Sequence, residues 1–195
     1  FTVDTTLSEP VITLDSADDS GNRGDNVTSV RSPGFTIENI DPDANRVTVQ
    51  IAHDGSSREV ELTQTGGRWH FTPDSEWTDG SYTLTVKVED NAGNIRYSTP
   101  LDVKVDTHTA IARIELVNDN GVPDDNLTNE MRPQFRVTVP EDVTVVRLSL
   151  DGSGSWVNAT AGATKGEWNY SWPSDVGEGK HTLTVEVTDA AGNTA

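Results

Sequence analysis

The chain has 195 residues, 33% of them hydrophobic, and its 32 acidic residues outnumber 14 basic ones for a formal net charge of -18. This charge repels phosphate backbones and anionic headgroups, so nucleic acid and membrane surfaces are not expected partners. The sequence has no run of about 18 apolar residues that could insert into a membrane. It contains no cysteine, so a secreted form would need a stabilising element other than a disulfide, such as a metal ion.

Apolar residues alternate with polar ones in short stretches from the N-terminus onward. This period of two is the pattern of half-buried β-strands, and no stretch shows sustained helical spacing. The alternating apolar positions are Val47, Val49 and Ile51; Val60 and Leu62; Tyr82, Leu84, Val86 and Val88; Leu101, Val103 and Val105; and Leu183, Val185 and Val187. Turn-forming pairs such as Asp54-Gly55 and Asp151-Gly152 separate the stretches. We therefore expect an all-β chain.

Three sequence landmarks occur twice, in the same order. Val3-Asp4-Thr5 recurs as Val105-Asp106-Thr107, Gly24–Thr28 recurs as Asp124–Thr128, and Gly80–Asn94 recurs as Gly179–Asn193. The offsets are close to 100 residues and differ slightly, which places the insertions and deletions in loops. Self-similarity at a fixed period indicates two copies of one domain.

Each copy spans about 100 residues with about seven short strands, which is typical of an immunoglobulin-like sandwich. We expect two tandem immunoglobulin-like β-sandwich domains, at 5–105 and 106–195, in a linear, rod-like arrangement. Trp69 and Trp168 occupy equivalent positions and are expected in the two cores. The second copy reaches only two residues past Asn193, so it lacks a counterpart of the last strand, and an exposed edge is expected there.

The first candidate metal site is a loop whose aspartates recur in both copies. Residues 19–28 and 119–128 both read Asp-x-Gly-x-x-x-Asp-x-apolar-Thr. Calcium takes six to eight oxygen ligands from carboxylates, carbonyls and water. Asp19 with Asp25, and Asp119 with Asp125, can each converge on one ion in a glycine-bent loop. The spacing differs from an EF-hand, which has a denser aspartate ladder and a terminal Glu.

Two further elements carry repeated aspartates. The turn Asp90–Asn94 recurs at Asp189–Asn193, and the linker residues Asp4 and Asp106 precede the two copies. If strand directions alternate along seven strands, the loop after the first strand lies at the C-terminal end of its domain. The turn between strands six and seven then lies at the N-terminal end.

This reasoning brings four carboxylates to the interdomain junction, where they would repel one another without a cation. They belong to Asp19, Asp25, Asp106 and Asp189. We expect calcium there, either as one ion or as two, one in the first loop and one at the linker.

Together, the Val-Asp-Thr linkers, the aspartate loops and the Asp-x-Ala-Gly-Asn turns resemble the bacterial Ig-like repeats of giant type I-secreted (RTX) adhesins. The resemblance covers nearly the whole chain. It implies a long rod of such domains, extended by calcium between neighbours, that presents an adhesive tip far from the cell. By this resemblance Asp19, Asp25, Asp106 and Asp189 match calcium ligands. The second loop departs from the first, with Asn118 opposite Asp18 and Asp124 opposite Gly24.

We accordingly expect a non-catalytic segment of an extracellular, surface-bound bacterial adhesin. Its expected partners are Ca²⁺ and neighbouring Ig-like repeats, with host glycans or surfaces as candidates through other repeats. Enzyme activity is not expected, because the four histidines are scattered and show no zinc-ligand or catalytic-triad spacing.

The sequence also leaves three other functions open. A carbohydrate-binding module would use Trp77, Trp156 and Trp172, which do not recur between the copies and so are not required by a shared core. A cadherin-like adhesion fragment would use similar calcium stiffening but normally carries Glu-containing linkers. Arg23-Gly24-Asp25 is an integrin-type tripeptide, although its Asp is also a candidate calcium ligand.

Overall fold

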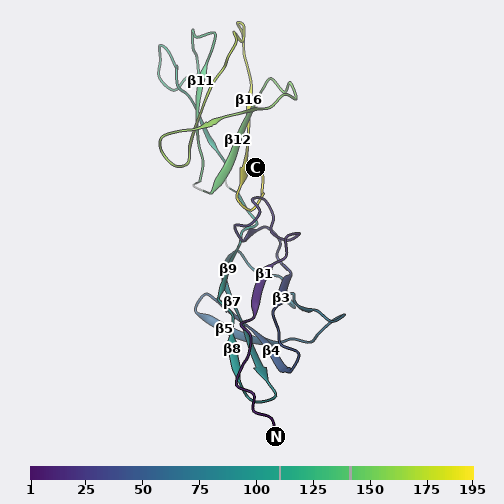
Figure 1. Ribbon diagram of the computed structural model, residues 1–195. Helices are drawn as coiled ribbons and strands as arrows, with labels where there is room; N and C mark the ends of the chain where they lie inside the picture. The colour runs from purple at the N-terminus through teal and green to yellow at the C-terminus, as the bar shows by residue number, and fades with distance from the viewer. Residues whose placement is uncertain (110, 141) are drawn as a thin grey trace. The chain divides into compact units, whose positions relative to one another are not determined.

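The computed structural model describes residues 1–109, 111–140 and 142–195, and the chain divides into two compact units, Phe1–Thr107 and His108–Ala195 (Figure 1). All regular secondary structure in these residues is β, as the alternating pattern predicts. No helix in the described part of the chain has the length and apolar character that a membrane crossing requires.

Unit 1 is a sandwich of two sheets. Its strands are β1 (Val11–Leu14), β2 (Val27–Thr28), β3 (Phe35–Glu38), β4 (Ala44–His53), β5 (Ser56–Glu61), β6 (Trp69–Phe71), β7 (Gly80–Asp90), β8 (Ile95–Tyr97) and β9 (Leu101–Val105). One sheet has the order β1-β3-β6 and the other β2-β9-β7-β4-β5, with β8 also paired to β7. The pairings are antiparallel except that of β2 with β9, which is parallel. Many partners are distant in sequence, as in other immunoglobulin-like sandwiches.

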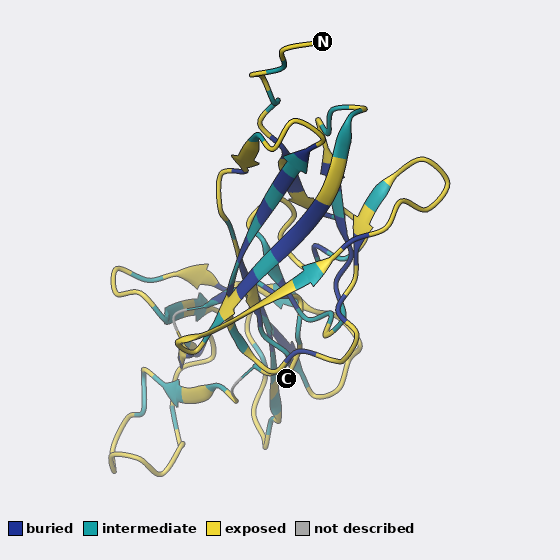
Figure 2. Cartoon of the chain, turned by 90° about the horizontal axis from the view of Figure 1, so that it is seen from below, coloured by how far each residue is buried: buried dark blue, intermediate teal, exposed yellow. Residues whose placement is uncertain are grey.

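The long strands of unit 1 bury every second side chain. Along β7 the buried residues are Tyr82, Leu84, Val86, Val88 and Asp90, and the intervening residues are more exposed. Figure 2 shows this alternation as dark blue bands along the long strands. In the antiparallel pairing of β4 with β7, Val47 lies opposite Val88 and Val49 opposite Val86, so both strands present valines to one face. The two-residue period of the sequence thus fixes which face becomes core.

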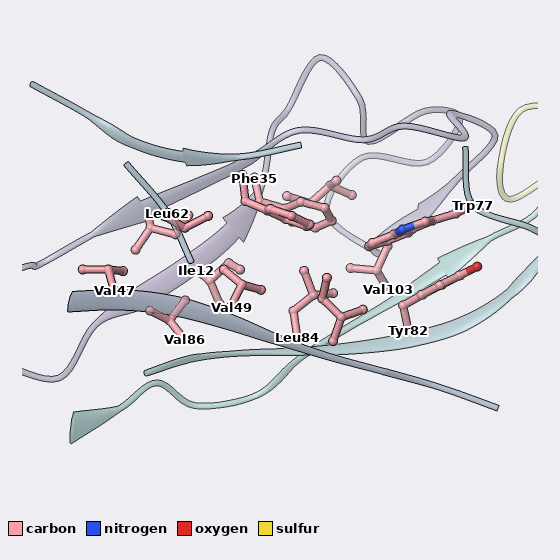
Figure 3. Packing of buried hydrophobic residues seen from close by; sticks show 14 of the residues in the cluster. Ile12, Phe35, Val47, Val49, Leu62, Trp77, Tyr82, Leu84, Val86 and Val103 are labelled. Atoms are coloured by element: carbon pink, nitrogen blue, oxygen red, sulfur yellow. The ribbon is translucent and has the colours of Figure 1, made fainter. Parts of the chain in front are cut away.

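The core of unit 1 fills the space between the sheets. Phe35, Val47, Val49, Leu84, Val86 and Val105 are fully buried. Trp77 is also buried, and its ring stacks on Tyr82 with 4.0 Å between the ring centroids. The Phe35 ring lies tilted beside it, with 5.8 Å between the centroids. Figure 3 shows Trp77, Tyr82 and Val103 together at one end of this core. Trp69 is half-buried against the same cluster, in line with the sequence prediction.

Unit 2 repeats the sandwich with fewer and shorter strands. They are β10 (Arg113–Leu116), β11 (Gln134–Thr138), β12 (Val143–Leu150), β13 (Val157–Asn158), β14 (Thr160–Ala161), β15 (Glu167–Ser171) and β16 (Leu183–Asp189). The sheets have the orders β10-β11-β15-β14 and β13-β12-β16. Val137, Val146, Leu148 and Val187 are buried in its core, and Trp168 packs against it.

The C-terminal edge of unit 2 differs from that of unit 1. Thr194 bridges to Thr188, in the place where β8 pairs with β7 in unit 1. The described residues of unit 2 include no strand in the place of β9. Correspondingly, β16 begins at Leu183, whereas β7 begins at Gly80, the counterpart of Gly179.

Candidate metal centre

Three aspartates of unit 1 meet at one place. Asp4, Asp43 and Asp90 each offer one carboxylate oxygen, and these three atoms lie within 4.8 Å of one another. Among the described residues this is the only such group of three acidic or histidine side chains. Asp4 precedes β1, Asp43 precedes β4, and Asp90 ends β7. The cluster therefore joins the N-terminal segment to two core strands.

The turn after β7 holds the cluster in place. The Asp90 carboxylate accepts hydrogen bonds from the backbone N–H of Ala92 (2.9 Å) and of Asn94 (2.8 Å), and from Asn94 Nδ2 (2.8 Å). Asn94 Nδ2 also donates to the backbone oxygen of Asp4 at 3.2 Å. The backbone oxygen of Asp43 accepts from Asn91 N (3.3 Å) and Asn91 Nδ2 (3.1 Å). One turn thus positions all three aspartates.

The pKa values of two aspartates in the cluster, Asp90 and Asp43, are shifted in opposite directions. The hydrogen bond from the Asn94 side chain, with N–H donors from Asn94, Ala92 and Gly93, lowers the pKa of Asp90 despite its burial. For Asp43, a hydrogen bond from its own backbone lowers the pKa. That effect is outweighed by the hydrogen bond shared with Asp4, by burial and by the charges of Asp4 and Asp90, so its pKa is raised. The site holds excess negative charge that a cation would neutralise.

The site agrees in part with the sequence prediction. Asp4 and Asp90 were expected as ligands, but Asp43 was not. The available signal was its repetition, because Asp142 stands at the same place before β12. In unit 2 the backbone oxygen of Asp142 accepts from Ala190 N at 3.0 Å, as Asp43 does from Asn91. The Asp189 carboxylate accepts from Asn193 N (2.9 Å) and Asn193 Nδ2 (2.9 Å), which reproduces the Asp90 turn.

The aspartate loop of unit 1 contains a buried oxygen without a partner. Asp19 is 7% exposed, and its Oδ2 accepts a hydrogen bond from Gly24 N. Its Oδ1 is buried without a hydrogen-bond partner in the described structure. Asp25 is exposed, and its carboxylate accepts from Val27 N at 2.9 Å. Buried carboxylate oxygens are rarely left unsatisfied, so a water molecule or a cation is the expected partner of Asp19 Oδ1.

The same loop in unit 2 repeats this arrangement. The Oδ1 atom of Asp119 is also buried without a partner among the residues described. Asp125 accepts from Leu127 N at 2.9 Å, which matches Asp25. Gln134 N donates to the Asn118 side chain at 3.0 Å, as Gly34 N donates to Asp18 at 2.7 Å. These contacts confirm the sequence register in which Asn118 stands opposite Asp18.

Asp106 lies at the same end of unit 1 as the aspartate loop. Its backbone N–H donates to Thr28 O at 2.8 Å, and its carboxylate pairs with Lys104 Nζ at 2.7 Å. The alternating strand directions predicted this proximity within the unit. The shared junction site of Asp19, Asp25 and Asp106 with Asp189 involves both units, and it stays a prediction.

The interpretation of Trp77 as a sugar-binding side chain needs correction. Trp77 is only 5% exposed, so its ring cannot stack on a sugar and belongs to the core. His181 precedes β16, and its Nδ1 contacts the Asp151 carboxylate at 2.7 Å. Arg147 covers the ring of the more exposed Trp156, at 5.1 Å from the centroid.

Comparison with solved structures gives distant matches. Fibronectin(III)-like modules of Clostridium thermocellum CbhA match with 15% identity and a TM-score of 0.45, over 95% of this chain and 89% of that chain. A 1.5-MDa bacterial ice-binding adhesin matches with 19% identity and a TM-score of 0.39, over 98% and 62%. A biofilm-associated protein domain matches with 13% identity and a TM-score of 0.32, over 96% and 28%. No curated protein gives a significant match.

The family comparison is more decisive, because it matches each repeat separately. The model of the bacterial Ig-like domain matches residues 6–107 and again residues 108–195. These ranges follow the two compact units and cover nearly the whole chain. The chain therefore belongs to the bacterial Ig-like domain family and consists of two tandem members of it.

Proposed function

We propose that this chain is a non-catalytic repeat segment of a bacterial surface adhesin, and that calcium stiffens it through its repeated aspartate sites. The observation that carries the proposal is the cluster of Asp4, Asp43 and Asp90, with three carboxylate oxygens within 4.8 Å. The names of the adhesin and biofilm-associated structures agree with this function but, at their low similarity, do not establish it.

The donor set fits a hard cation such as calcium. Calcium is held by oxygen ligands from carboxylates, carbonyls and water, and the cluster offers only oxygens. A cavity of ≈340 Å³ borders it and is lined by Asp4, Asp41 and Asp43, so water has access to complete the coordination. A bound ion would supply positive charge beside Asp43, whose pKa is raised by its hydrogen bond with Asp4, by burial and by the charges of Asp4 and Asp90.

The location of Asp4 explains how calcium binding would stiffen the chain. Asp4 lies in the exposed segment before β1, whereas Asp90 is buried at the end of a core strand. An ion held by both would restrict the backbone entering the domain. In the second repeat, Asp142 and Asp189 correspond to Asp43 and Asp90, and Asp106 corresponds by sequence to Asp4. We expect the same role for that set, with Asp19 and Asp119 as ligands in the loops.

Calcium should stabilise unit 1, and Asp43→Asn should remove this effect. Extracellular calcium sites commonly have Kd values of ~10⁻⁴–10⁻³ M. At a hundred times Kd, mass action adds about 2.7 kcal/mol of stability. Without calcium, Asp43→Asn should leave unit 1 as stable as the unsubstituted chain or more so, because it removes repulsion. Calorimetric unfolding with calcium or with chelator measures both effects.

The matched control is Asp74→Asn, which removes one exposed aspartate charge of the same unit elsewhere. It should keep the full calcium response. An unchanged calcium response in Asp43→Asn would place the ion elsewhere and refute the proposed site.

The stiffening itself is tested by small-angle scattering of the two-unit chain. We expect a larger radius of gyration with ~2 mM calcium than with chelator, a concentration that saturates typical extracellular sites. Asp106→Ala should abolish the difference, since the linker aspartate is the proposed ligand between repeats. If Asp106→Ala kept the full calcium-dependent change, the linker role would be wrong even if the ion bound in unit 1.

A further inference from the structure

Unit 1 carries an open groove over the outer face of its three-stranded sheet, β1-β3-β6. The groove has a volume of ≈1200 Å³. Three side chains in one row across the strands line it, Thr13 on β1, Thr36 on β3 and His70 on β6. They point away from the core, because strand positions alternate and the next residues along β1 and β6, Leu14 and Phe71, are buried. The row therefore forms the floor of a surface groove on unit 1.

In unit 2 the same positions carry paired charges. By the register of the strands, Glu115 and Arg136 stand where unit 1 has Thr13 and Thr36. Arg136 lies 3.9 Å from the Glu115 carboxylate and 3.8 Å from that of Glu167. These long side chains interact with one another across the sheet face, whereas unit 1 has short hydroxyl side chains at two of the positions. The difference leaves the sheet face of unit 1 accessible to a ligand.

The loop after β1 is two residues longer in unit 1 than in unit 2. Asp15 N donates to Gly34 O at 2.9 Å, and Val117 N donates to the equivalent Gln134 O at 2.8 Å, so Asp15 and Val117 correspond. Residues 16–17 follow in unit 1 and have no counterpart in unit 2, because the two loops align again at the next residue. Both extra residues line the groove, so the insertion extends its wall.

Gly34 makes room for a hydrogen-bonded pair at the floor of the groove. A Cβ atom at this position would lie 2.6 Å from Asp15 Oδ2 and 3.0 Å from His70 Nε2, so the Gln134 side chain of unit 2 would displace them. His70 Nε2 donates to Asp15 Oδ2 at 2.8 Å, and Thr36 Oγ1 donates to Asp15 Oδ1 at 2.6 Å. These bonds fix the imidazole and the hydroxyl before any ligand arrives, which lowers the entropy cost of binding.

Around this floor the groove offers polar side chains that are free to bind. They belong to Thr13, Glu38, Gln64 and Arg68, all of which are exposed and line the groove. None of these four side chains makes a hydrogen bond or ion pair with another described residue. Together they supply hydrogen-bond donors and acceptors, with one positive and one negative charge. Trp69, which is half-buried, adds an aromatic surface to the lining.

We propose that this groove binds a neutral oligosaccharide. Sugar hydroxyls both donate and accept hydrogen bonds, which suits the mixed hydroxyl, amide, carboxylate and guanidinium groups of the lining. The C–H faces of a sugar ring are apolar and would pack against Trp69. The opposite charges of Glu38 and Arg68 offset each other, and the net charge of -18 disfavours a polyanion.

The position of the groove argues against a peptide strand as its occupant. A peptide that extends a sheet pairs with the free main-chain groups of an edge strand. The groove instead lies over the face of β3, whose main-chain groups pair with β1 on one side and with β6 on the other. Recognition in the groove therefore depends on side chains. Such a site would give the segment a ligand of its own, and it needs no calcium.

The first experiment measures binding by NMR. The isotope-labelled chain is titrated with cellohexaose, laminarihexaose and mannohexaose up to about 10 mM, so that a site with a Kd of ~1 mM would be nearly saturated. We expect at least one of these sugars to shift the amide signals of Thr13, Thr36 and His70 and the indole signal of Trp69. All measurements are made in chelator, so failure of the calcium proposal cannot affect them. No binding by any of these sugars, or shifts confined to residues outside the groove, would overturn the proposal.

The second experiment closes the groove with the side chains of unit 2. The double substitution Thr13→Glu and Thr36→Arg transfers the pair of Glu115 and Arg136 to unit 1, at positions where the same fold already carries it. Binding should weaken by more than about tenfold, because the long side chains occupy the place of the sugar. The unfolding midpoint of unit 1 should stay within about 3 °C. Unchanged affinity in this folded variant would show that the sugar binds elsewhere.

Single substitutions remove one contact each without closing the groove. Arg68→Gln and Gln64→Ala change exposed side chains that have no partner among the described residues, so stability should not change. Each should weaken binding by about threefold to tenfold, as for one lost hydrogen bond. The matched control is Arg58→Gln, which changes an exposed arginine on β5 of the other sheet and should keep full affinity. Equal affinity of all three variants would contradict the assigned contacts.

An acidic sugar tests the neutrality of the ligand. An alginate oligosaccharide of the same length, which carries a carboxylate on each ring, is titrated in the same way. It should bind no more tightly than the neutral oligosaccharide that binds best. Tighter alginate binding that weakens with added salt and is lost in Arg68→Gln would assign the groove to anionic sugars and contradict the proposal.

Discussion

At the scale of single residues, the two repeats use the same backbone positions for different side chains. Tyr82 packs in the core of unit 1, but its counterpart His181 contacts the Asp151 carboxylate in unit 2. The hydrogen bonds that the His181 ring donates to the Asp151 carboxylate and to the Gly177 backbone oxygen raise the pKa of His181. The Asp151 carboxylate accepts hydrogen bonds from His181 and from Thr182 N, and these lower the pKa of Asp151.

The stability of unit 2 should therefore depend on pH through this pair. A raised histidine pKa contributes stability that is full below the unfolded value of 6.5 and is lost as pH rises through the folded value. The lowered Asp151 pKa adds stability above 3.8, which is lost as pH falls through the folded value. Unit 2 should thus lose stability as the pH rises above 6.5, measured by urea unfolding. His181→Gln should flatten this slope, and an unchanged slope would exclude the pair as its cause.

Trp77 and Trp156 also differ in role at this scale, because one is buried and the other is not. Trp77→Ala should destabilise unit 1 by about 3–5 kcal/mol, as expected when a large aromatic ring leaves a packed core. Trp156→Ala should cost only about 0.5–1 kcal/mol, since it removes a partly exposed ring under Arg147. Denaturant unfolding of each unit compares them. Similar costs for the two substitutions would contradict this assignment.

At the scale of elements, local sequence predicts strands and turns well, because alternation and turn residues act over few positions. The strands around Val47–Ile51 and Tyr82–Val88 and the turn at Asp90–Asn94 follow from such patterns. Asp43 was missed, because its role depends on β4 lying beside β7, a pairing between distant segments. The burial of Trp77 was missed for the same reason. Trp77 is buried because it packs against Phe35 and Tyr82. The alternation of apolar and polar residues does not predict that these two side chains lie at the same place.

At the scale of the whole molecule, the two repeats differ in how much core each one builds. Sixteen apolar residues are buried in the core cluster of unit 1, against seven in the described part of unit 2. Neither cluster contains residues of the other unit. Each sandwich therefore has its own hydrophobic stabilisation, and in the described residues that of unit 2 is the smaller.

Calorimetry of the chain in chelator should consequently resolve two unfolding transitions, the lower one from unit 2. Val47 and Val146 occupy equivalent positions and are both 0% exposed, so they form a matched pair of probes. Val146→Ala should lower only the first transition and Val47→Ala only the second, each by about 2 kcal/mol of lost burial and cavity formation. The double substitution should shift both by the same amounts, because effects in separate cores add. If either substitution moved both transitions, the two units would unfold as one cooperative body. That outcome would contradict the inference that unit 2 unfolds on its own with a lower stability.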